Sequence, residues 1–166
     1  MPGATTNIRE VPESGYEMTK FFEGYMPSMY TDSVGKRTIG YGFNADEPTV
    51  SRLLPRGVQL GLRELAPAEA ESIYHTLYQQ AVKDAFEFVG EPAFQKMSPR
   101  QFAIVTDMAY NMGKDRLAGF KKLRARIQEG DWQGAAREMQ NSKWARQVGR
   151  RSRHHVEKFA QVQAIS

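Results

Sequence analysis

The apolar residues of this chain change their spacing once, and that change constrains the fold more than any other feature. Between Met29 and Phe43 they form short runs around glycines, which is typical of a β-hairpin with a glycine-containing turn. From Pro67 onward they recur about every 3.6 residues, as on the buried face of a helix. The sequence therefore predicts an α+β fold that is mostly helical, with a small β-hairpin lobe and a larger helical lobe.

Residues that start and stop helices divide the helical part into segments. Ser14 followed by Glu17 is the pattern of a capping box, and Pro27 prevents that helix from extending much past Tyr25. Proline and glycine mark most of the later boundaries in the same way. The expected helical segments are 14–25, one turn at 50–54, 67–89, 98–112, 116–128, 131–140 and 150–163.

The length of 166 residues fits one domain. Proline and glycine interrupt any periodicity in residues 1–13, which we expect to form a flexible arm. The domain itself then covers residues 14–166. Within it, we expect a small lobe at about 26–66 and a helical lobe at about 67–166, joined by the helix at 14–25.

The composition excludes several classes of protein. The absence of cysteine excludes disulfides and thiol catalysis. No apolar run approaches the roughly 18 residues of a membrane span, and the first residues lack the apolar core of a secretory signal. His154 and His155 are adjacent and should point apart on a helix, and His75 has no partner at ligand spacing. We therefore expect neither a metal site nor a cofactor.

The formal net charge is +4, and much of the basic charge lies near the end of the chain. Two interpretations of this stripe stay open. It is either a solvated helix face or a surface that attracts a polyanion, such as nucleic acid or an acidic cell envelope. The basic residues of the stripe are Lys143, Arg146, Arg150, Arg151, Arg153 and Lys158.

Two carboxyl groups are candidates for acid–base chemistry. Glu23 falls in the last turn of the first expected helix, where the helix dipole and burial beside Phe22 or Tyr25 should raise the pKa of its carboxyl. Asp32 lies nine residues later, at a polar hairpin where ionisation is less costly. Two carboxyls in contrasting environments beside one cleft are the arrangement that glycoside hydrolysis requires.

Thr38 adds a third group to this set. It lies on the opposite arm of the expected hairpin from Asp32, at a cross-strand distance of about 5 Å if both side chains share a face. A carboxylate and a hydroxyl so placed can orient one water molecule, which suits an inverting hydrolysis. Taken alone, each residue has a simpler interpretation, Glu23 as a surface glutamate and Asp32 as a turn former.

The order and spacing of these residues resemble the catalytic signature of the T-even phage lysozyme family, glycoside hydrolase family 24. The resemblance continues in the helical part and covers roughly residues 14–163, with residues 45–65 poorly matched. The matching segments are Phe22-Glu23-Gly24, Tyr30-Thr31-Asp32, Thr38-Ile39-Gly40-Tyr41-Gly42-Phe43-Asn44, Asp107–Gly113, Gly119-Phe120, Asp131-Trp132, Ser142-Lys143-Trp144 and Arg150-Arg151.

The resemblance implies a two-lobed fold with an active-site cleft between the lobes. The implied reaction is hydrolysis of the β-1,4 bond between N-acetylmuramic acid and N-acetylglucosamine in bacterial peptidoglycan. Glu23 takes the position of the general acid, whereas Asp32 and Thr38 take that of the water-activating pair, with inversion at the anomeric carbon. Arg151 matches an arginine that pairs with the catalytic glutamate, and such a pair would lower the pKa of Glu23 and oppose the effect of the helix end.

The same resemblance suggests residues that bind the saccharide. Tyr110 and Asn111 fall where the family lines its cleft with an aromatic and an amide, and Lys143 is a weaker candidate for this role. Trp132 and Trp144 are large enough to stack on sugars, but we expect both to belong to the core.

Three alternatives remain beside the muramidase hypothesis. A lytic transglycosylase needs the acid but no water-activating carboxylate, so Asp32 and Thr38 argue against it. A catalytically idle peptidoglycan-binding module would lack one of the catalytic residues. A nucleic-acid-binding protein rests only on the basic stripe. We expect a monomer made in the host cytoplasm that reaches the cell wall through a holin or as part of a virion.

Overall fold

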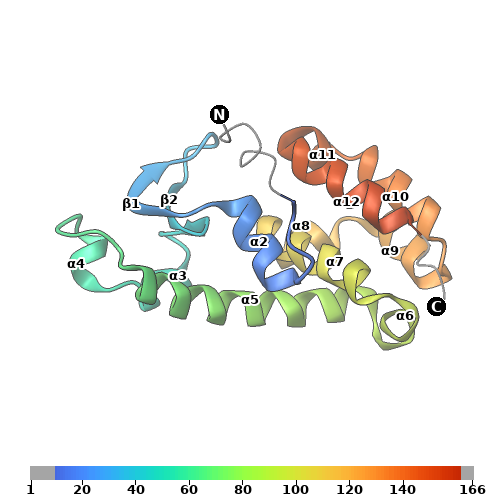
Figure 1. The fold of residues 1–166 in the computed structure, drawn as a ribbon, viewed down its shortest axis with the longest axis horizontal. Coiled ribbons are helices and arrows are strands. Elements are labelled where there is room, and N and C mark those ends of the chain that lie inside the picture. Colours follow the sequence, from blue (N-terminus) through green and yellow to red (C-terminus); the bar gives the residue numbers. More distant parts are fainter. Residues whose placement is uncertain (1–9, 162–166) are drawn as a thin grey trace.

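The computed structural model describes residues 10–161, and residues 1–9 of the expected arm lie outside this range. Helices make up most of the molecule, with a small sheet towards one end (Figure 1). The predicted α+β, mostly helical fold is therefore confirmed. In chain order the elements are α2 (Gly15–Glu23), β1 (Met26–Thr31), β2 (Arg37–Gly40), β3 (Phe43–Asn44), α3 (Pro48–Leu53), α4 (Arg56–Gln59), α5 (Pro67–Val89), α6 (Glu91–Lys96), α7 (Pro99–Met112), α8 (Lys114–Ala118), α9 (Lys121–Glu129), α10 (Trp132–Gln140), α11 (Lys143–Val148) and α12 (Arg150–Ala160).

Capping side chains set the ends of the helices that carry the site. Ser14 accepts a hydrogen bond from the backbone N–H of Glu17, but only this half of the predicted capping box forms within residues 10–161. Helix α2 ends at Glu23 rather than at Tyr25, because Gly24 follows with a φ of 71° and its N–H bonds to the carbonyl of Lys20. The catalytic candidate Glu23 is thus the last residue of its helix.

Helix α7 begins with a complete capping box. Gln101 donates its backbone N–H to Ser98 at 3.1 Å, and its side-chain oxygen accepts from the N–H of Ser98 at 3.0 Å. Asp131 caps α10, as predicted, by accepting from the N–H of Gly134. These local signals explain why the starts of both helices were predictable.

The predicted hairpin forms, and a third short strand extends it. The sheet is antiparallel in the order β1-β2-β3. Tyr30 pairs with Thr38 across the hairpin, and Ile39 pairs with Phe43 in the third strand. Because Ile39 and Phe43 are each only 1% exposed, this register fixes which face of the sheet packs on the core.

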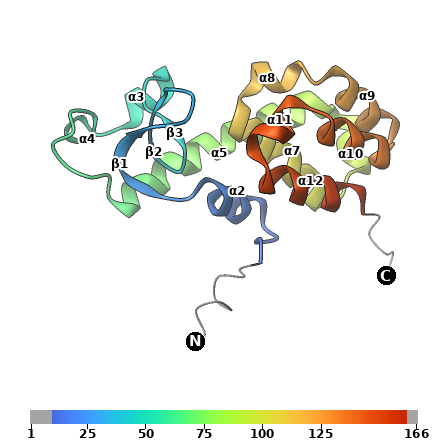
Figure 2. The same cartoon turned by 90° about the horizontal axis from the view of Figure 1, so that it is seen from above.

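Two hydrophobic cores give the molecule two lobes, and α5 belongs to both. Figure 2 shows the sheet with α3 and α4 at one end of α5, and the later helices gathered at the other end. The first half of α5 places Ile73 and Tyr74 in the core of the small lobe, and its second half places Ala85 and Phe88 in the core of the helical lobe. One continuous helix therefore sets how the two lobes are spaced.

The tryptophans are part of the helical core, as the sequence predicted. Trp144 is 1% exposed, and Trp132 is partly buried and packs against the same cluster. Val11, in the described part of the N-terminal arm, also packs against this core, and Glu13 forms an ion pair with Arg100 at 3.1 Å.

Short helices account for most of the differences from the expected segments. The stretch 44–65 contains two helices, α3 and α4, where one turn was expected. The expected helix at 116–128 is divided into α8 and α9 by Gly119 and Phe120, and α6 and α11 were not anticipated. Helices of four to six residues are not stable alone, so their positions depend on tertiary packing rather than on local pattern.

Truncating Phe43 should unfold the small lobe more readily. The ring is 1% exposed, so Phe43→Ala leaves a cavity, and we expect a loss of about 3–5 kcal/mol in the free energy of unfolding measured with urea. Val34→Ala is the matched control in the same lobe, because Val34 is 70% exposed and its truncation should change stability by less than about 0.5 kcal/mol. Equal losses for the two variants would contradict this assignment of the core.

Candidate active site

A cleft of about 780 Å³ lies between the sheet of the small lobe and helices α7 and α8 of the helical lobe. Glu23, Asp32 and Thr38 all line it, so the structure brings the three predicted catalytic residues to one cavity. Tyr110 and Asn111 line the same cleft. Lys143 does not belong to this group of lining residues, and it borders a separate hollow of about 450 Å³ beside Phe120 and Trp144.

Glu23 is held at the end of α2 in a nearly closed environment. Only 12% of its side chain is exposed, and its Oε2 lies 3.0 Å from Nη1 of Arg151. Burial raises the pKa of the Glu23 carboxyl, Asp107 raises it further, and the ion pair with Arg151 and a hydrogen bond from Asn111 oppose the rise. The net result is a raised pKa for Glu23. The effect of desolvation therefore outweighs that of the ion pair with Arg151, a balance that the sequence alone left open.

The partner arginine is itself held by a buried carboxylate that the sequence analysis did not single out. Asp107 of α7 is fully buried and accepts from Nε and Nη2 of Arg151 at 2.7 and 2.8 Å. Thr19 donates to the same carboxylate at 2.6 Å, and Nε2 of His155 lies 2.6 Å from it. Burial would raise the pKa of Asp107, but Arg151 and the hydrogen bond with His155 hold it well below its ordinary value. Asp107 was detectable as the one acidic residue in a largely apolar helix, because buried charges are normally paired.

Asp32 is a turn former and a cleft residue at the same time. Its Oδ1 accepts from the backbone N–H groups of Val34 and Lys36 at 3.0 and 2.8 Å, which holds the hairpin turn together. Within residues 10–161, these bonds leave its other oxygen without a hydrogen-bond partner. The carboxylate is therefore positioned by one oxygen and able to bind water with the second.

The relation of Thr38 to Asp32 differs from the expected direct pairing. The register places Thr38 opposite Tyr30, so Asp32 lies one step further along and diagonal to Thr38. Diagonal residues are about 7–8 Å apart rather than about 5 Å, a separation that a bridging water fits better than a direct contact. Thr38 donates its hydroxyl hydrogen to the carbonyl of Lys36 at 3.0 Å, which leaves the oxygen free to accept.

Backbone conformation and close packing explain why the Thr-Ile-Gly-x-Gly segment has glycine at two positions. Gly40 and Gly42 adopt φ values of 67° and 70°, a region that side chains with a Cβ rarely occupy. A Cβ at Gly40 would collide with the ring of Phe43, and one at Gly42 would collide with the carboxyl of Glu23. Gly42 thus leaves room for the buried acid beside the sheet.

Tyr110 and Asn111 line the cleft and also form hydrogen bonds with other parts of the protein. The hydroxyl of Tyr110 donates to the carbonyl of Tyr41 at 2.6 Å, which links α7 to the sheet. Trp144 donates its indole N–H to Oδ1 of Asn111 at 2.9 Å, so the amide group of Asn111 faces Glu23 as a donor. Asn111, one of the two predicted saccharide-binding residues, therefore also contacts the acid.

The histidines do not behave as predicted. His154 and His155 were expected to point apart, but their Nδ1 atoms lie 2.9 Å from each other. The reason is that His155 turns inward to reach Asp107, which brings its ring against that of its neighbour. Among residues 10–161 no group of three or more His, Cys, Asp or Glu could hold a metal ion.

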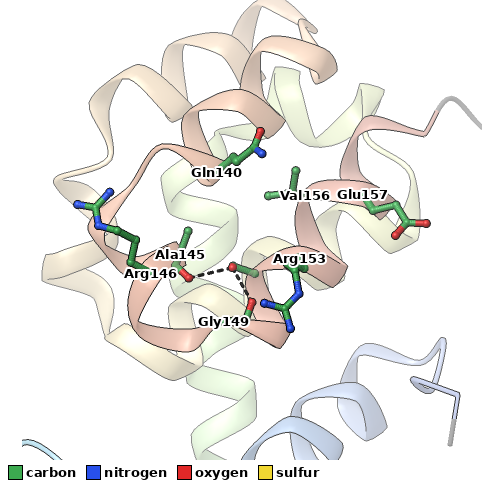
Figure 3. Close-up of a pocket in the computed structure, with 8 residues that line it drawn as sticks. Gln140, Ala145, Arg146, Gly149, Arg153, Val156 and Glu157 are labelled. Carbon is green, nitrogen blue, oxygen red and sulfur yellow. Dashed lines mark hydrogen bonds between the residues drawn. The ribbon is translucent and has the colours of Figure 1, made fainter. Parts of the chain in front are cut away.

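The basic stripe near the end of the chain is not one uniform surface. Arg151 is buried in the site, whereas Arg146 and Arg153 are exposed beside a hollow of about 340 Å³ formed by α10, α11 and α12. Figure 3 shows their guanidinium groups extending to different sides of this hollow rather than converging in it. The hydroxyl of Ser152 donates to the backbone carbonyl oxygens of Ala145 and Gly149. The hollow therefore shows no converging set of charged groups.

A nearly buried acid beside a polar cleft between two lobes is the arrangement that the resemblance to lysozymes implied. The family model described as phage lysozyme matches residues 20–158, and the chain belongs to this family. It is 26% identical over 155 residues to "Probable T4-type lysozyme 2" of Dictyostelium discoideum, a match that covers 86% of this chain and 91% of the relative. "Probable T4-type lysozyme 1" of the same organism is 27% identical over 152 residues, covering 82% of this chain and 87% of the relative. Family membership supports a general lysozyme function, the hydrolysis of peptidoglycan.

Gly42→Ala should inactivate the site by displacing Glu23. The new Cβ would occupy the space of the Glu23 carboxyl, and a displacement of about 1 Å costs on the order of 100-fold in rate. Gly61→Ala is the matched control, because Gly61 has a φ of 73° and a Cβ there meets nothing within 4 Å. Both variants should lose a similar stability from backbone strain, about 1–2 kcal/mol. Peptidoglycan turnover per folded molecule distinguishes them, and wild-type turnover by Gly42→Ala would refute the displacement.

Proposed function

We propose that the protein is a muramidase that hydrolyses the β-1,4 bond between N-acetylmuramic acid and N-acetylglucosamine. The observation that carries this proposal is the burial of Glu23 at the cleft, which raises the pKa of its carboxyl. A carboxylic acid that keeps its proton towards neutral pH can act as a general acid. Glu23 would donate that proton to the glycosidic oxygen as the bond to the anomeric carbon breaks.

The second half of the proposed reaction uses Asp32 and Thr38. A water held between the second oxygen of Asp32 and the hydroxyl oxygen of Thr38 attacks the anomeric carbon and gives its proton to Asp32. Water then arrives opposite the departing oxygen, so the configuration inverts and the β-linked substrate yields an α-anomer. The departing sugar leaves with the proton of Glu23, and the hydroxyl of the water remains on the new reducing end.

The proposed substrate contacts follow the lining of the cleft. Tyr110 and Asn111 would contact the saccharide, since both border the cavity beside Glu23. Lys143 has less support for this role, because it borders a different hollow. With this substrate, the proposed site of action is the bacterial cell wall. No helix within the described residues is both long and apolar enough to cross a membrane.

Glu23→Gln is the direct test of the proposed acid. The amide keeps the size of the side chain but cannot donate a proton in the same way, so release of reducing sugar from purified peptidoglycan should fall about 100–10,000-fold. Glu17→Gln, on an exposed residue of the same helix, is the matched control and should retain wild-type activity. Intact activity in Glu23→Gln, or an inactive wild-type protein, would overturn the proposal.

The products of the same digestion separate hydrolysis from lytic transglycosylation. A hydrolase leaves a free reducing end, which NMR of the fresh products should show first as the α-anomer if the reaction inverts. A 1,6-anhydro end would instead identify a transglycosylase and remove Asp32 and Thr38 from the mechanism.

A further inference from the structure

Helix α7 buries a carboxylate that does not line the cleft but is connected to it through one side chain. Asp107 is 0% exposed and is absent from the lining of the cavity. Its partners come from two other helices, with Thr19 on α2 and both Arg151 and His155 on α12. A buried charge is costly unless such partners satisfy it, so its position in the core calls for a role.

The geometry of the arginine suggests that role. The guanidinium is planar and rigid, so fixing two of its nitrogens also fixes the direction of the third. Asp107 holds Nε and Nη2 at 2.7 and 2.8 Å, and the remaining Nη1 lies 3.0 Å from Oε2 of Glu23. Asp107 therefore determines where the positive charge of Arg151 is placed relative to Glu23.

The charges of the cluster have a second consequence. Arg151 carries one positive charge between two carboxyl groups that are largely shielded from water. An arginine without a second carboxylate would stabilise the ionised form of Glu23. With Asp107 ionised, its negative charge opposes part of that attraction, because it disfavours a second negative charge at Glu23.

We infer that Asp107 is a positioning residue, which aims Arg151 at Glu23 and offsets the arginine's charge so that Glu23 keeps its proton. The inference rests on the proposed function of Glu23 as the general acid. Tyr110 on α7 and Tyr30 on β1 also face Glu23, and neither carries a positive charge. The cleft that Glu23 lines also holds Asp32, Lys36 and Lys114, but within the described residues the cation paired with Glu23 is Arg151.

His155 extends the cluster on the side away from the cleft. Its Nε2 lies 2.6 Å from Oδ2 of Asp107, and its Nδ1 lies 2.9 Å from Nδ1 of the half-buried His154. Burial first, and then the neighbouring His155, lower the pKa of His154 to about 4. His154 is therefore neutral as the pH rises above that value.

Asp107→Asn tests the inference through the pH dependence of kcat/KM on solubilised peptidoglycan. The general acid must be protonated, so activity falls as pH rises through the pKa of Glu23. Without the negative charge of Asp107, the pKa of Glu23 drops. The alkaline limb of the pH profile, where kcat/KM falls as pH rises, should then move to lower pH by about one unit or more, with KM little changed. A loss of activity that is equal at every pH, with the limb in place, would reduce Asp107 to a structural role.

Three further variants keep the test decisive. Asp107→Ser removes the same charge and leaves room for water, and it should move the limb in the same direction if the asparagine variant does not fold. Asp107→Asn combined with Arg151→Gln removes both charges, and it should return the limb to the wild-type position or above. Thr19→Val removes a hydrogen bond to Asp107 but keeps the charges, so it should lower stability and leave the limb in place.

The outcomes also separate this inference from the proposed function. If Glu23→Gln remains active, the proposed acid is wrong whatever Asp107 does. If Glu23→Gln is inactive and the limb stays in place in both Asp107 variants, only the role of Asp107 is overturned.

Discussion

The guanidinium of Arg151 contacts two carboxyl groups that come from two other helices. It joins α2, α7 and α12 through Glu23, Asp107 and Arg151, residues that are far apart in the sequence. Charges so deeply placed are destabilising unless every partner is present. Within the described residues, no buried polar side-chain atom lacks a hydrogen-bond partner. The residues that hold the acid therefore also link three helices of the molecule.

The two cores give this cluster its place beside the cleft. Helix α5 passes from one core to the other, and the hydroxyl of Tyr110 on α7 bonds to the sheet at Tyr41. Glu23 lies at the end of α2 where the chain enters the sheet, so its carboxyl reaches the cleft while its helix packs on the helical lobe. Gly42 then allows the sheet to approach that carboxyl closely. The acid is thus shielded from water by both lobes without being removed from the cavity.

Local sequence signals predicted the parts of the fold that local physics controls. The capping residues Ser98 and Asp131 marked the starts of their helices, and the glycine-rich segment marked the hairpin. The ion pair of Glu23 with Arg151 followed from the family resemblance and is present. Short helices such as α6 and α11 escaped prediction, because helices of that length form only where neighbouring elements hold them.

The same local signals did not predict the strand register or the contacts between residues far apart in the sequence. The register that sets Thr38 opposite Tyr30 depends on a turn closed by the side chain of Asp32, and hydrophobic pattern alone does not fix that step. The network of Asp107 joins residues 44 to 88 positions apart, so no spacing rule connects them. A charged residue inside an apolar helix was the available signal, and it identifies the residue but not its partners.

The mechanism requires that the site raises the pKa of Glu23 despite the arginine beside it. Titration of the wild-type protein by NMR, with ¹³C in the glutamate carboxyl groups and Glu23 assigned by its loss in Glu23→Gln, measures this directly. We expect the resonance of Glu23 to titrate with a midpoint above the ordinary value of 4.5. A midpoint at or below 4.5 would show that Arg151 dominates, and it would contradict the role of Glu23 as a general acid.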